Sequence, residues 1–312
     1  MWNPPALPLL HRPSQARRAP RFLVGVDGGG TGTRVQLNDD QGRCLGVGRA
    51  GPSALAQGIT QAWTHVLQAL QGAATQAGLA GIDPADCAIG LGLSGVTLLE
   101  QARAFIDAEP GFAFIALDSD GFTGVLGAHG GQPGAVLVSG TGSVGEALRH
   151  DGSRACVGGW GWAIGDEGSG AWLGRCAMQH AQRAFDGREA EGPLTTALID
   201  RAGRSREGLL AWCAAAGQQG YASLAPLVFE MAERDSLAAA LIDEAVRELE
   251  SVVQALDPQA DLPLVLAGSV AERLAAHFSE ALRSRCVAAQ GDAVAGALRL
   301  LQKSMLTMGG GE

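Results

Sequence analysis

Residues 26–42 read VDGGGTGTRVQLNDDQG, and a second stretch of the same pattern, VLVSGTGSVGEALRHDG, spans residues 136–152. The two stretches are offset by 110 positions, so that the Gly-Thr-Gly-Thr of residues 30–33 corresponds to the Gly-Thr-Gly-Ser of residues 140–143. A further glycine closes each stretch at the same spacing. One Gly/Thr-rich turn alone is weak evidence, whereas two in register indicate one structural unit that is used twice.

The segments around each copy predict the same order of elements. An apolar strand runs into the Gly/Thr turn, a second strand such as residues 33–39 returns from it, and another turn follows. Strand–helix units continue each half, with helices expected at residues 59–78 and 169–187. The pattern predicts an α/β fold of two lobes that face each other across a cleft, with both Gly/Thr turns at the cleft.

The composition narrows the class of protein. The 312 residues allow about two domains, 46% of them are apolar, and the formal net charge is −9. This acidic balance argues against a nucleic-acid or anionic-membrane partner, and no apolar run is long enough to span a membrane. The six cysteines show no metal-binding spacing, which predicts reduced thiols in the cytoplasm. Residues 1–20 are rich in proline and predict a disordered leader, with an organelle address as the alternative.

Lysine is nearly absent, which bears on how phosphate could be bound. The only lysine is Lys303, so a P-loop lysine, a protein-kinase strand lysine and a Schiff-base lysine are all excluded. Phosphate would have to be bound by backbone N–H groups and a metal ion. Glycines leave these groups unobstructed and hydroxyls add donors, so the two Gly/Thr turns could hold the β- and γ-phosphates of a nucleotide. The alternative is that both are ordinary hairpin turns.

Several carboxylates end strands or precede helices. Asp27 follows a buried strand beside the first turn, where it could position Mg²⁺ or merely cap the turn. Asp118 and Asp120 follow another buried strand, and either could cap the next helix or accept a proton from a substrate hydroxyl. Asp166 and Glu167 precede a long helix, where acids suit the helix dipole, but their loop is rich in glycine and tryptophan, as sugar- and nucleotide-contacting loops are.

At this point six motifs resemble those of the bacterial N-acetylglucosamine and glucosamine kinases, in the BadF/BadG/BcrA/BcrD ATPase group of the sugar-kinase/Hsp70/actin superfamily. The motifs are GVDGGGTGTRV, DSDGFTGVLGAHGG, VSGTGSVGEAL, GGWGWAIGDEGSGAWLG, LAGSVAERL and GDAVAGAL. The resemblance covers about residues 21–302. It implies two ribonuclease-H-like lobes of the actin/hexokinase type with ATP and Mg²⁺ between them. It also implies transfer of the γ-phosphate to the 6-hydroxyl of an amino sugar, either N-acetylglucosamine or glucosamine.

The resemblance assigns roles to individual residues. The catalytic base would be Asp120 rather than Asp118, and Asp27 would position the metal. The sugar would be bound by Asp120, Thr141, Gly142 and Asp166. The nucleotide would be bound by the two turns and by the end of the strand in LAGSV, for which simple strand-to-helix packing is the alternative. These cofactor-binding residues would be Gly28, Gly29, Gly30, Thr31, Gly32, Thr33, Gly140, Thr141, Gly142, Ser143, Gly268 and Ser269.

The predicted lobes comprise residues 21–118 with a final helix at 291–303, and residues 119–290 with a helical insert at 192–256. The insert has no chemical signature, and a homodimer is common in the family. Two residues depart from the family pattern, because Ser119 and Ala54 stand where asparagines are usual. They leave the choice between glucosamine and N-acetylglucosamine open.

Two rival functions remain at the level of sequence. The iron–sulfur activator ATPases of the same group need cysteines that hold a cluster, and no cysteine here lies in such a motif. A nucleotide-dependent sensor of the same fold, without sugar turnover, is the other alternative.

Overall fold

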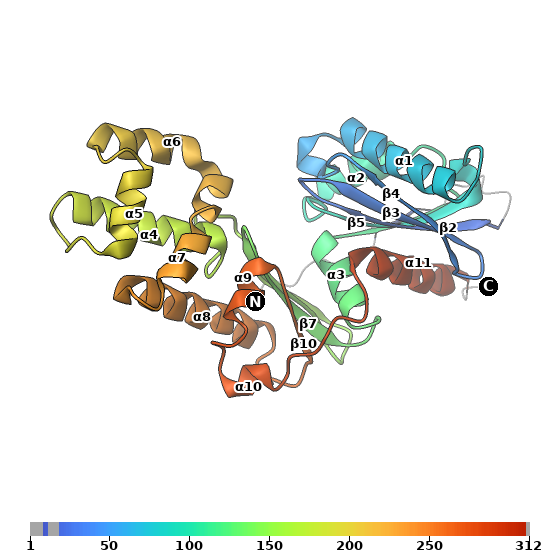
Figure 1. Cartoon of the computed structure of the whole chain (residues 1–312). Coiled ribbons are helices and arrows are strands. Elements are labelled where there is room, and N and C mark those ends of the chain that lie inside the picture. The colour runs from blue at the N-terminus through green and yellow to red at the C-terminus, as the bar shows by residue number, and fades with distance from the viewer. Residues whose placement is uncertain (1–8, 12–18, 310–312) are drawn as a thin grey trace. The chain divides into compact units, whose positions relative to one another are not determined.

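The computed structural model describes residues 9–11 and 19–309, which form two compact units (Figure 1). Unit 1 comprises the chain up to Gly134 together with Leu148–Arg154 and the residues from Ala288 onward. Unit 2 comprises Ala135–Ala147 and Ala155–Val287. Within the described ranges, every helix is too short or too polar to span a membrane.

Unit 1 is built on a six-stranded sheet in the order β1-β6-β5-β2-β3-β4. β2, β3 and β4 form an antiparallel meander, and β5 and β6 run parallel to β2. β3 alternates between buried and half-exposed residues, whereas β5 is buried throughout because helices cover both faces of the sheet. The strands are β1 (Leu9–His11), β2 (Phe22–Gly28), β3 (Thr33–Asp39), β4 (Cys44–Ala50), β5 (Cys87–Leu93) and β6 (Phe114–Asp118).

Glycines in the strands let the helices of unit 1 approach the sheet closely. A Cβ atom at Gly48 would clash with the carbonyl oxygen of Ala69 in α1, and one at Gly90 would clash with that of Ala297 in α11. α1 and α2 therefore lie on one face of the sheet, and α3 and α11 lie on the other (Figure 1). These helices are α1 (Ile59–Gln76), α2 (Leu99–Asp107), α3 (Asp120–Ala128) and α11 (Ala293–Gly309), and two short 3-10 helices, η1 (Leu55–Gln57) and η2 (Pro84–Asp86), complete the unit.

Unit 2 holds a four-stranded sheet in the order β10-β7-β8-β9, in which β10 runs parallel to β7. The strands are β7 (Gly134–Ser139), β8 (Ser143–Leu148), β9 (Arg154–Gly158) and β10 (Leu264–Ala267). The helices are α4 (Gly170–Phe185), α5 (Pro193–Arg201), α6 (Arg206–Ala222), α7 (Ala225–Met231), α8 (Ser236–Leu256), α9 (Ser269–Leu274) and α10 (Glu280–Arg283). One apolar core joins buried residues of the sheet to those of α4, α5 and α8.

The two hairpins repeat the same hydrogen bonds, as the sequence repeat predicts. In the far turn of the first hairpin, the N–H of Asp39 donates to the carbonyl of Arg43 at 3.0 Å. At the matching positions of the second hairpin, the N–H of Arg149 donates to the carbonyl of Ser153 at 2.8 Å. Gly42 and its counterpart 110 residues later both have a φ of 80°, which favours glycine. The repeat therefore reflects one hairpin structure that is used twice.

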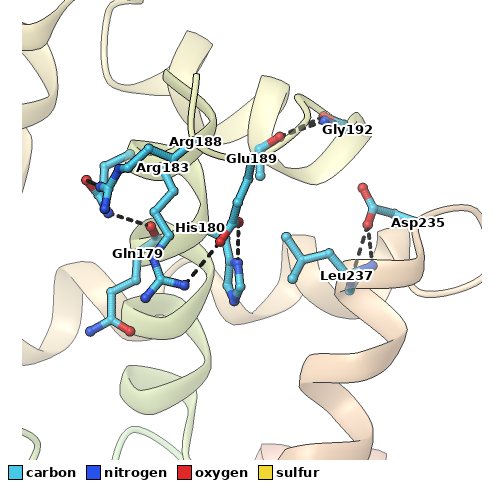
Figure 2. A network of polar contacts seen from close by, with 11 residues as sticks. Gln179, His180, Arg183, Arg188, Glu189, Gly192, Asp235 and Leu237 are labelled. Atoms are coloured by element: carbon cyan, nitrogen blue, oxygen red, sulfur yellow. Dashed lines mark hydrogen bonds and ion pairs between the residues drawn. The ribbon is translucent and has the colours of Figure 1, made fainter. Parts of the chain in front are cut away.

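The predicted helical insert forms α5 to α8 and shares one apolar core with α4, while polar contacts fix its helices and the loop before it (Figure 2). The carboxylate of Asp235 caps the first turn of α8 and also accepts the N–H of Leu194 at the start of α5, at 2.7 Å. Glu189, in the loop before α5, pairs with His180 at 2.7 Å and with Arg183 at 3.1 Å, both on α4. The insert is therefore an integral part of the unit's packing.

The N-terminal segment differs from the predicted disordered leader. Residues 9–11 form β1, which pairs antiparallel with β6. This pairing satisfies backbone groups that β6 would otherwise leave open at the edge of the sheet. The rest of the predicted leader that precedes residue 19 lies outside the described residues.

The end of the first lobe also differs from the prediction. The boundary was expected after residue 118, but unit 1 continues to Gly134 and includes α3. The reason is the close packing of α3 against α11, where a Cβ atom at Gly127 would clash with the carbonyl oxygen of Asp292. The segment after LAGSV forms two helices, α9 and α10, because Ser279 begins a new helix by capping the N–H of Leu282.

Candidate functional site

The first Gly/Thr turn joins β2 to β3 in unit 1. The N–H of Gly29 donates to the carbonyl of Gly32 at 3.0 Å, and the carbonyl of Gly29 accepts the N–H groups of Ser53 and Ala54. Gly28 must lack a side chain, because a Cβ atom there would clash with the hydroxyl of Ser53. Gly30 and Thr31 are exposed at the tip of the turn. The turn thus presents backbone N–H groups from a fixed support, as a phosphate nest requires.

The side chain of Thr33, which was predicted to contact the nucleotide, lies inside unit 1. The residue is only 1% exposed, and its hydroxyl donates to the carbonyl of Gly51 at 2.6 Å and can accept from the Ser53 hydroxyl, which lies 2.8 Å away. The hydroxyl is therefore used inside the protein, where it joins the turn to the loop that follows β4. Ala54, one of the two residues noted as departing from the expected pattern, is buried in the same loop.

Asp27, the predicted metal residue, lies next to Arg34 across the β2–β3 pair. Both Nε and Nη2 of Arg34 donate to Oδ2 of Asp27, at 3.1 and 2.7 Å, and Nη1 pairs with Asp292 before α11 at 2.9 Å. The hydrogen bond to Asp27 raises the pKa of Arg34. Oδ1 of Asp27 makes no hydrogen bond or ion pair within the described part of the chain. Arg34 and Asp292 were not identified from the sequence.

The residues around Asp27 fit a magnesium ion that is shared with a phosphate. No cluster of three or more His, Cys, Asp or Glu side chains that could hold a metal occurs among residues 9–11 and 19–309. Mg²⁺ in phosphoryl-transfer sites is commonly bound by one or two carboxylates, and phosphate oxygens and water complete its shell. The uncommitted oxygen of Asp27 suits that kind of site.

Asp118 and Asp120 are distinguished by their surroundings. Asp118 is fully buried, and its two oxygens accept from Nη1 and Nη2 of Arg154 at 2.9 and 2.8 Å. The guanidinium of Arg154 also lies 3.4 Å from the ring centre of Phe122. Burial raises the pKa of Asp118, and the pairing with Arg154 opposes that rise. Asp118 is thus a structural residue, which leaves Asp120 as the available carboxylate.

Asp120 opens α3 but does not cap it. The cap is Ser119, whose hydroxyl accepts the N–H of Phe122 at 3.1 Å. Burial raises the pKa of Asp120 above its ordinary value of 3.8, and the charge of Asp27 raises it further, while a hydrogen bond from the N–H of Gly121 acts against the rise. A carboxylate whose pKa is raised toward neutral is a better proton acceptor than an ordinary aspartate.

The second Gly/Thr turn joins β7 to β8 in unit 2. The carbonyl of Gly140 accepts the N–H of Gly170 at 2.8 Å, and that of Thr141 accepts the N–H of Ala171 at 3.1 Å, so the turn is tied to the start of α4. Ser143 repeats the behaviour of Thr33, because it is only 6% exposed and its hydroxyl donates to the carbonyl of Glu167 at 2.7 Å. Its hydroxyl is therefore used inside unit 2, and its contact with a nucleotide stays a prediction.

Asp166 lies beside the second turn and is 4% exposed. Its φ of 56° is unusual for a residue other than glycine. Oδ1 accepts the N–H of Gly161 and Oδ2 accepts Nε2 of Gln218, both at 3.2 Å. A Cβ atom at Gly142 would lie 2.5 Å from Oδ2, so glycine is needed for this approach. Burial raises the pKa of Asp166, and the N–H of Gly161 opposes the rise.

A cavity of about 150 Å³ adjoins the second turn within unit 2. Gly140, Thr141 and Ser269 line it, together with Phe229 and Arg273, whose guanidinium carbon lies 5.2 Å from the Phe229 ring centre. The sequence did not identify the last two. Gly268 has a φ of 93° and packs against the end of β7, where a Cβ atom would clash with the carbonyl of Ser139. Ser269 therefore faces the cavity, while Gly268 shapes the turn beside it.

The chain matches the sequence profile described as the BadF/BadG/BcrA/BcrD ATPase family over residues 24–308. It is 33% identical over 283 residues to the glucosamine kinase of Vibrio cholerae, a match that covers 90% of this chain and 96% of that protein. It is 25% identical over 279 residues to the N-acetyl-D-glucosamine kinase of Dictyostelium discoideum, covering 81% of this chain and 86% of that one.

Solved structures show the same fold. A candidate N-acetylglucosamine kinase of Chromobacterium violaceum is 48% identical, with a TM-score of 0.84 over 91% of this chain and 99% of that one. The ROK hexokinase of Thermus thermophilus has a TM-score of 0.55 at 17% identity, over the same shares of both chains, which shows a shared fold alone. The predicted α/β fold of the hexokinase type is thereby confirmed.

Proposed function

Because the chain belongs to the BadF/BadG/BcrA/BcrD ATPase family, we propose that it is an ATP-dependent kinase that phosphorylates the 6-hydroxyl of an amino sugar. The observation that carries this function is the pair of Gly/Thr turns. Each turn is supported by a buried hydroxyl, from Thr33 or Ser143, and the glycines of each turn would let backbone N–H groups approach a phosphate. Protein groups held in place in this way suit the transfer of a phosphoryl group, since positioning and charge stabilisation dominate that chemistry.

The nucleotide end of the proposed site lies in unit 2. The cavity lined by Thr141, Ser269 and Phe229 would take the base and ribose of ATP, with the Phe229–Arg273 pair as a flat wall. The two turns would bind the phosphates through their N–H groups. Asp27 would hold Mg²⁺, which would supply positive charge against the phosphate oxygens.

The acceptor end of the proposed site uses two carboxylates with different tasks. Asp120 would accept the proton of the 6-hydroxyl as that oxygen attacks phosphorus, and its raised pKa suits a base. Asp166, which is fixed by Gly161 and Gln218, would accept hydrogen bonds from ring hydroxyls of the sugar. We place the reaction in the cytoplasm, where ATP is available and the six free cysteines stay reduced.

The relatives do not agree on one sugar, so the acceptor is a matter for experiment. ADP release would be measured with Mg·ATP and glucosamine, N-acetylglucosamine, N-acetylmannosamine, glucose or no sugar. We expect turnover that depends on glucosamine or N-acetylglucosamine and yields the 6-phosphate. Equal ADP release with and without sugar would overturn the kinase assignment and would indicate an ATPase or a nucleotide-dependent sensor.

A further inference from the structure

We propose that Gln218 is a positioning residue for the sugar, and that a break in α6 at Gly217 places it beside Asp166. The proposal rests on the proposed function, in which Asp166 contacts the sugar. It gives the helical insert of unit 2 a role in recognising the acceptor, in addition to its part in the packing of the unit.

The break in α6 is a backbone feature that requires glycine. Gly217 has φ 52° and ψ −168° inside an otherwise helical segment. This region of conformational space is essentially restricted to glycine. A Cβ atom at Gly217 would meet nothing within 4 Å, so lack of space does not explain the glycine. What the glycine provides is the change of direction immediately before Gln218.

The change of direction brings a polar side chain to the proposed sugar end of the site. Nε2 of Gln218 donates to Oδ2 of Asp166 at 3.2 Å. The same nitrogen would lie 3.2 Å from a Cβ atom at Gly142, so the missing side chain of the second turn leaves room for it. The next residue, Gln219, is exposed and makes no side-chain contact of this kind among the described residues.

Aromatic contacts hold the segment after the break against the loop that carries Asp166. Tyr221 packs on Trp162 of that loop, with ring centres 5.7 Å apart, and on Trp212 of the segment before the break, at 5.4 Å. Arg175 of α4 donates to the carbonyl of Trp162 at 2.9 Å. The short segment 218–222 and the loop before α4 are therefore packed together, which restricts where Gln218 can lie.

This arrangement would prepare Asp166 to receive a neutral, hydroxyl-bearing ring. A carboxylate has about four acceptor positions, and Gly161 and Gln218 occupy one on each oxygen of Asp166. The backbone N–H of Ser143 also donates to this carboxylate, so about one position remains to accept a sugar hydroxyl. Within the described residues, Oε1 of Gln218 has no hydrogen-bond partner, so it could accept a further hydroxyl or N–H group. Without Gln218, Oδ2 of Asp166 would lose this donor and would have to be oriented by the sugar, at the expense of sugar affinity.

The test compares three variants with the wild type: Gln218→Ala, Gln218→Met and the matched control Gln219→Ala. KM for the sugar and KM for ATP are measured separately, and each variant's thermal midpoint is recorded. A hydrogen bond to a charged group contributes about 1.5–3 kcal/mol, so Gln218→Ala should raise KM for the sugar about 10- to 100-fold and leave KM for ATP within about twofold. Gln218→Met keeps the length of the side chain but lacks the N–H, and should behave in the same way. Gln219→Ala should match the wild type.

Two results would overturn the proposal. One is a wild-type KM for the sugar in Gln218→Met, which would mean that only packing matters. The other is an equal rise of both KM values, which would mean a general structural role. Failure of the proposed function would be recognised separately, as a wild-type protein without sugar-dependent turnover. In that case calorimetric titration of the wild type and the same variants with glucosamine and N-acetylglucosamine would decide, and sugar binding that is absent or unchanged by Gln218→Ala would reject the role.

Discussion

Thr33 and Ser143 show how a single hydroxyl can organise a binding turn without touching the ligand. Each follows a Gly/Thr turn at a matching position, and each donates inward, to the carbonyls of Gly51 and Glu167 respectively. The turn is thereby joined to a second loop, which restricts the arrangement of its N–H groups. Such preorganisation lowers the cost of binding because little ordering remains to be done.

Asp120 and Asp118 lie two positions apart, but substitution by asparagine should lower the activity in one case and the stability in the other. Asp120→Asn cannot accept the proton of the sugar hydroxyl, so kcat should fall about 10²- to 10⁴-fold while the fold is retained. Asp118→Asn serves as the control. It breaks the buried pair with Arg154, and loss of one partner from such a pair costs about 3–5 kcal/mol of unfolding free energy. Near-normal turnover in Asp120→Asn would contradict the assignment of the base.

The difference in stability between Asp120→Asn and the wild type should depend on pH in a defined direction. Burial and Asp27 raise the pKa of Asp120 in the folded state above the ordinary value of 3.8. Between these two pKa values the folded protein binds more protons than the unfolded chain, so this group lowers stability as pH rises through that window. Asparagine does not titrate, so the thermal midpoint of the variant relative to the wild type should increase from about pH 4 toward neutrality. A constant difference across this range would show that the pKa is not raised.

At the scale of elements, glycines allow α3 and α11 to pack at short range. Cβ atoms at Gly127 and Gly296 would each clash with a backbone carbonyl of the facing helix, those of Asp292 and Thr123. The two helices therefore meet backbone to backbone, and α11 also covers β2 and β5. This contact fixes α3, and with it Asp120 at the start of α3, to the sheet of unit 1.

A methyl group at the α3–α11 contact should be costly. Gly127→Ala would force the two helices apart, and overpacking of this kind typically costs about 1–3 kcal/mol of unfolding free energy. Gly124→Ala is the control in the same helix, because nothing lies within 4 Å of its Cβ position and alanine favours helix by up to about 1 kcal/mol. Chemical denaturation of both variants measures the difference. Equal stability of the two would mean that the helices do not approach as closely as described.

For the molecule as a whole, local patterns predicted the hairpins, and residues far apart in the chain completed the site. Alternating strands, turn glycines and the repeat depend on neighbouring residues, so the sequence indicated them directly. The contacts Arg154–Asp118, Gln218–Asp166 and Arg34–Asp292 join residues 36, 52 and 258 positions apart. They arise from packing, which a single sequence does not display. Gly217 is one of three glycines in the helical run at 206–222, so the sequence alone did not single out Gln218.

Truncation after Val287 should destabilise unit 1 and leave unit 2 folded. It would remove α11 and uncover the face of β2 and β5 on which Leu298 and Leu301 are buried. The core of unit 2 contains no residue beyond 287, so it should be retained. Hydrogen exchange should therefore show lost protection in β5 and kept protection in α8. Unchanged protection of β5 would mean that the sheet does not depend on α11.

The position of α11 also sets an order for biosynthesis. A ribosome makes every residue of unit 2 before it makes the helix that covers the sheet of unit 1. Domains usually fold as units with the N-terminal one first during synthesis, but here the unit that begins first is finished last. The growing chain must carry an uncovered apolar sheet face through the whole translation of unit 2. Conditions that slow elongation over this interval should therefore increase its dependence on chaperones.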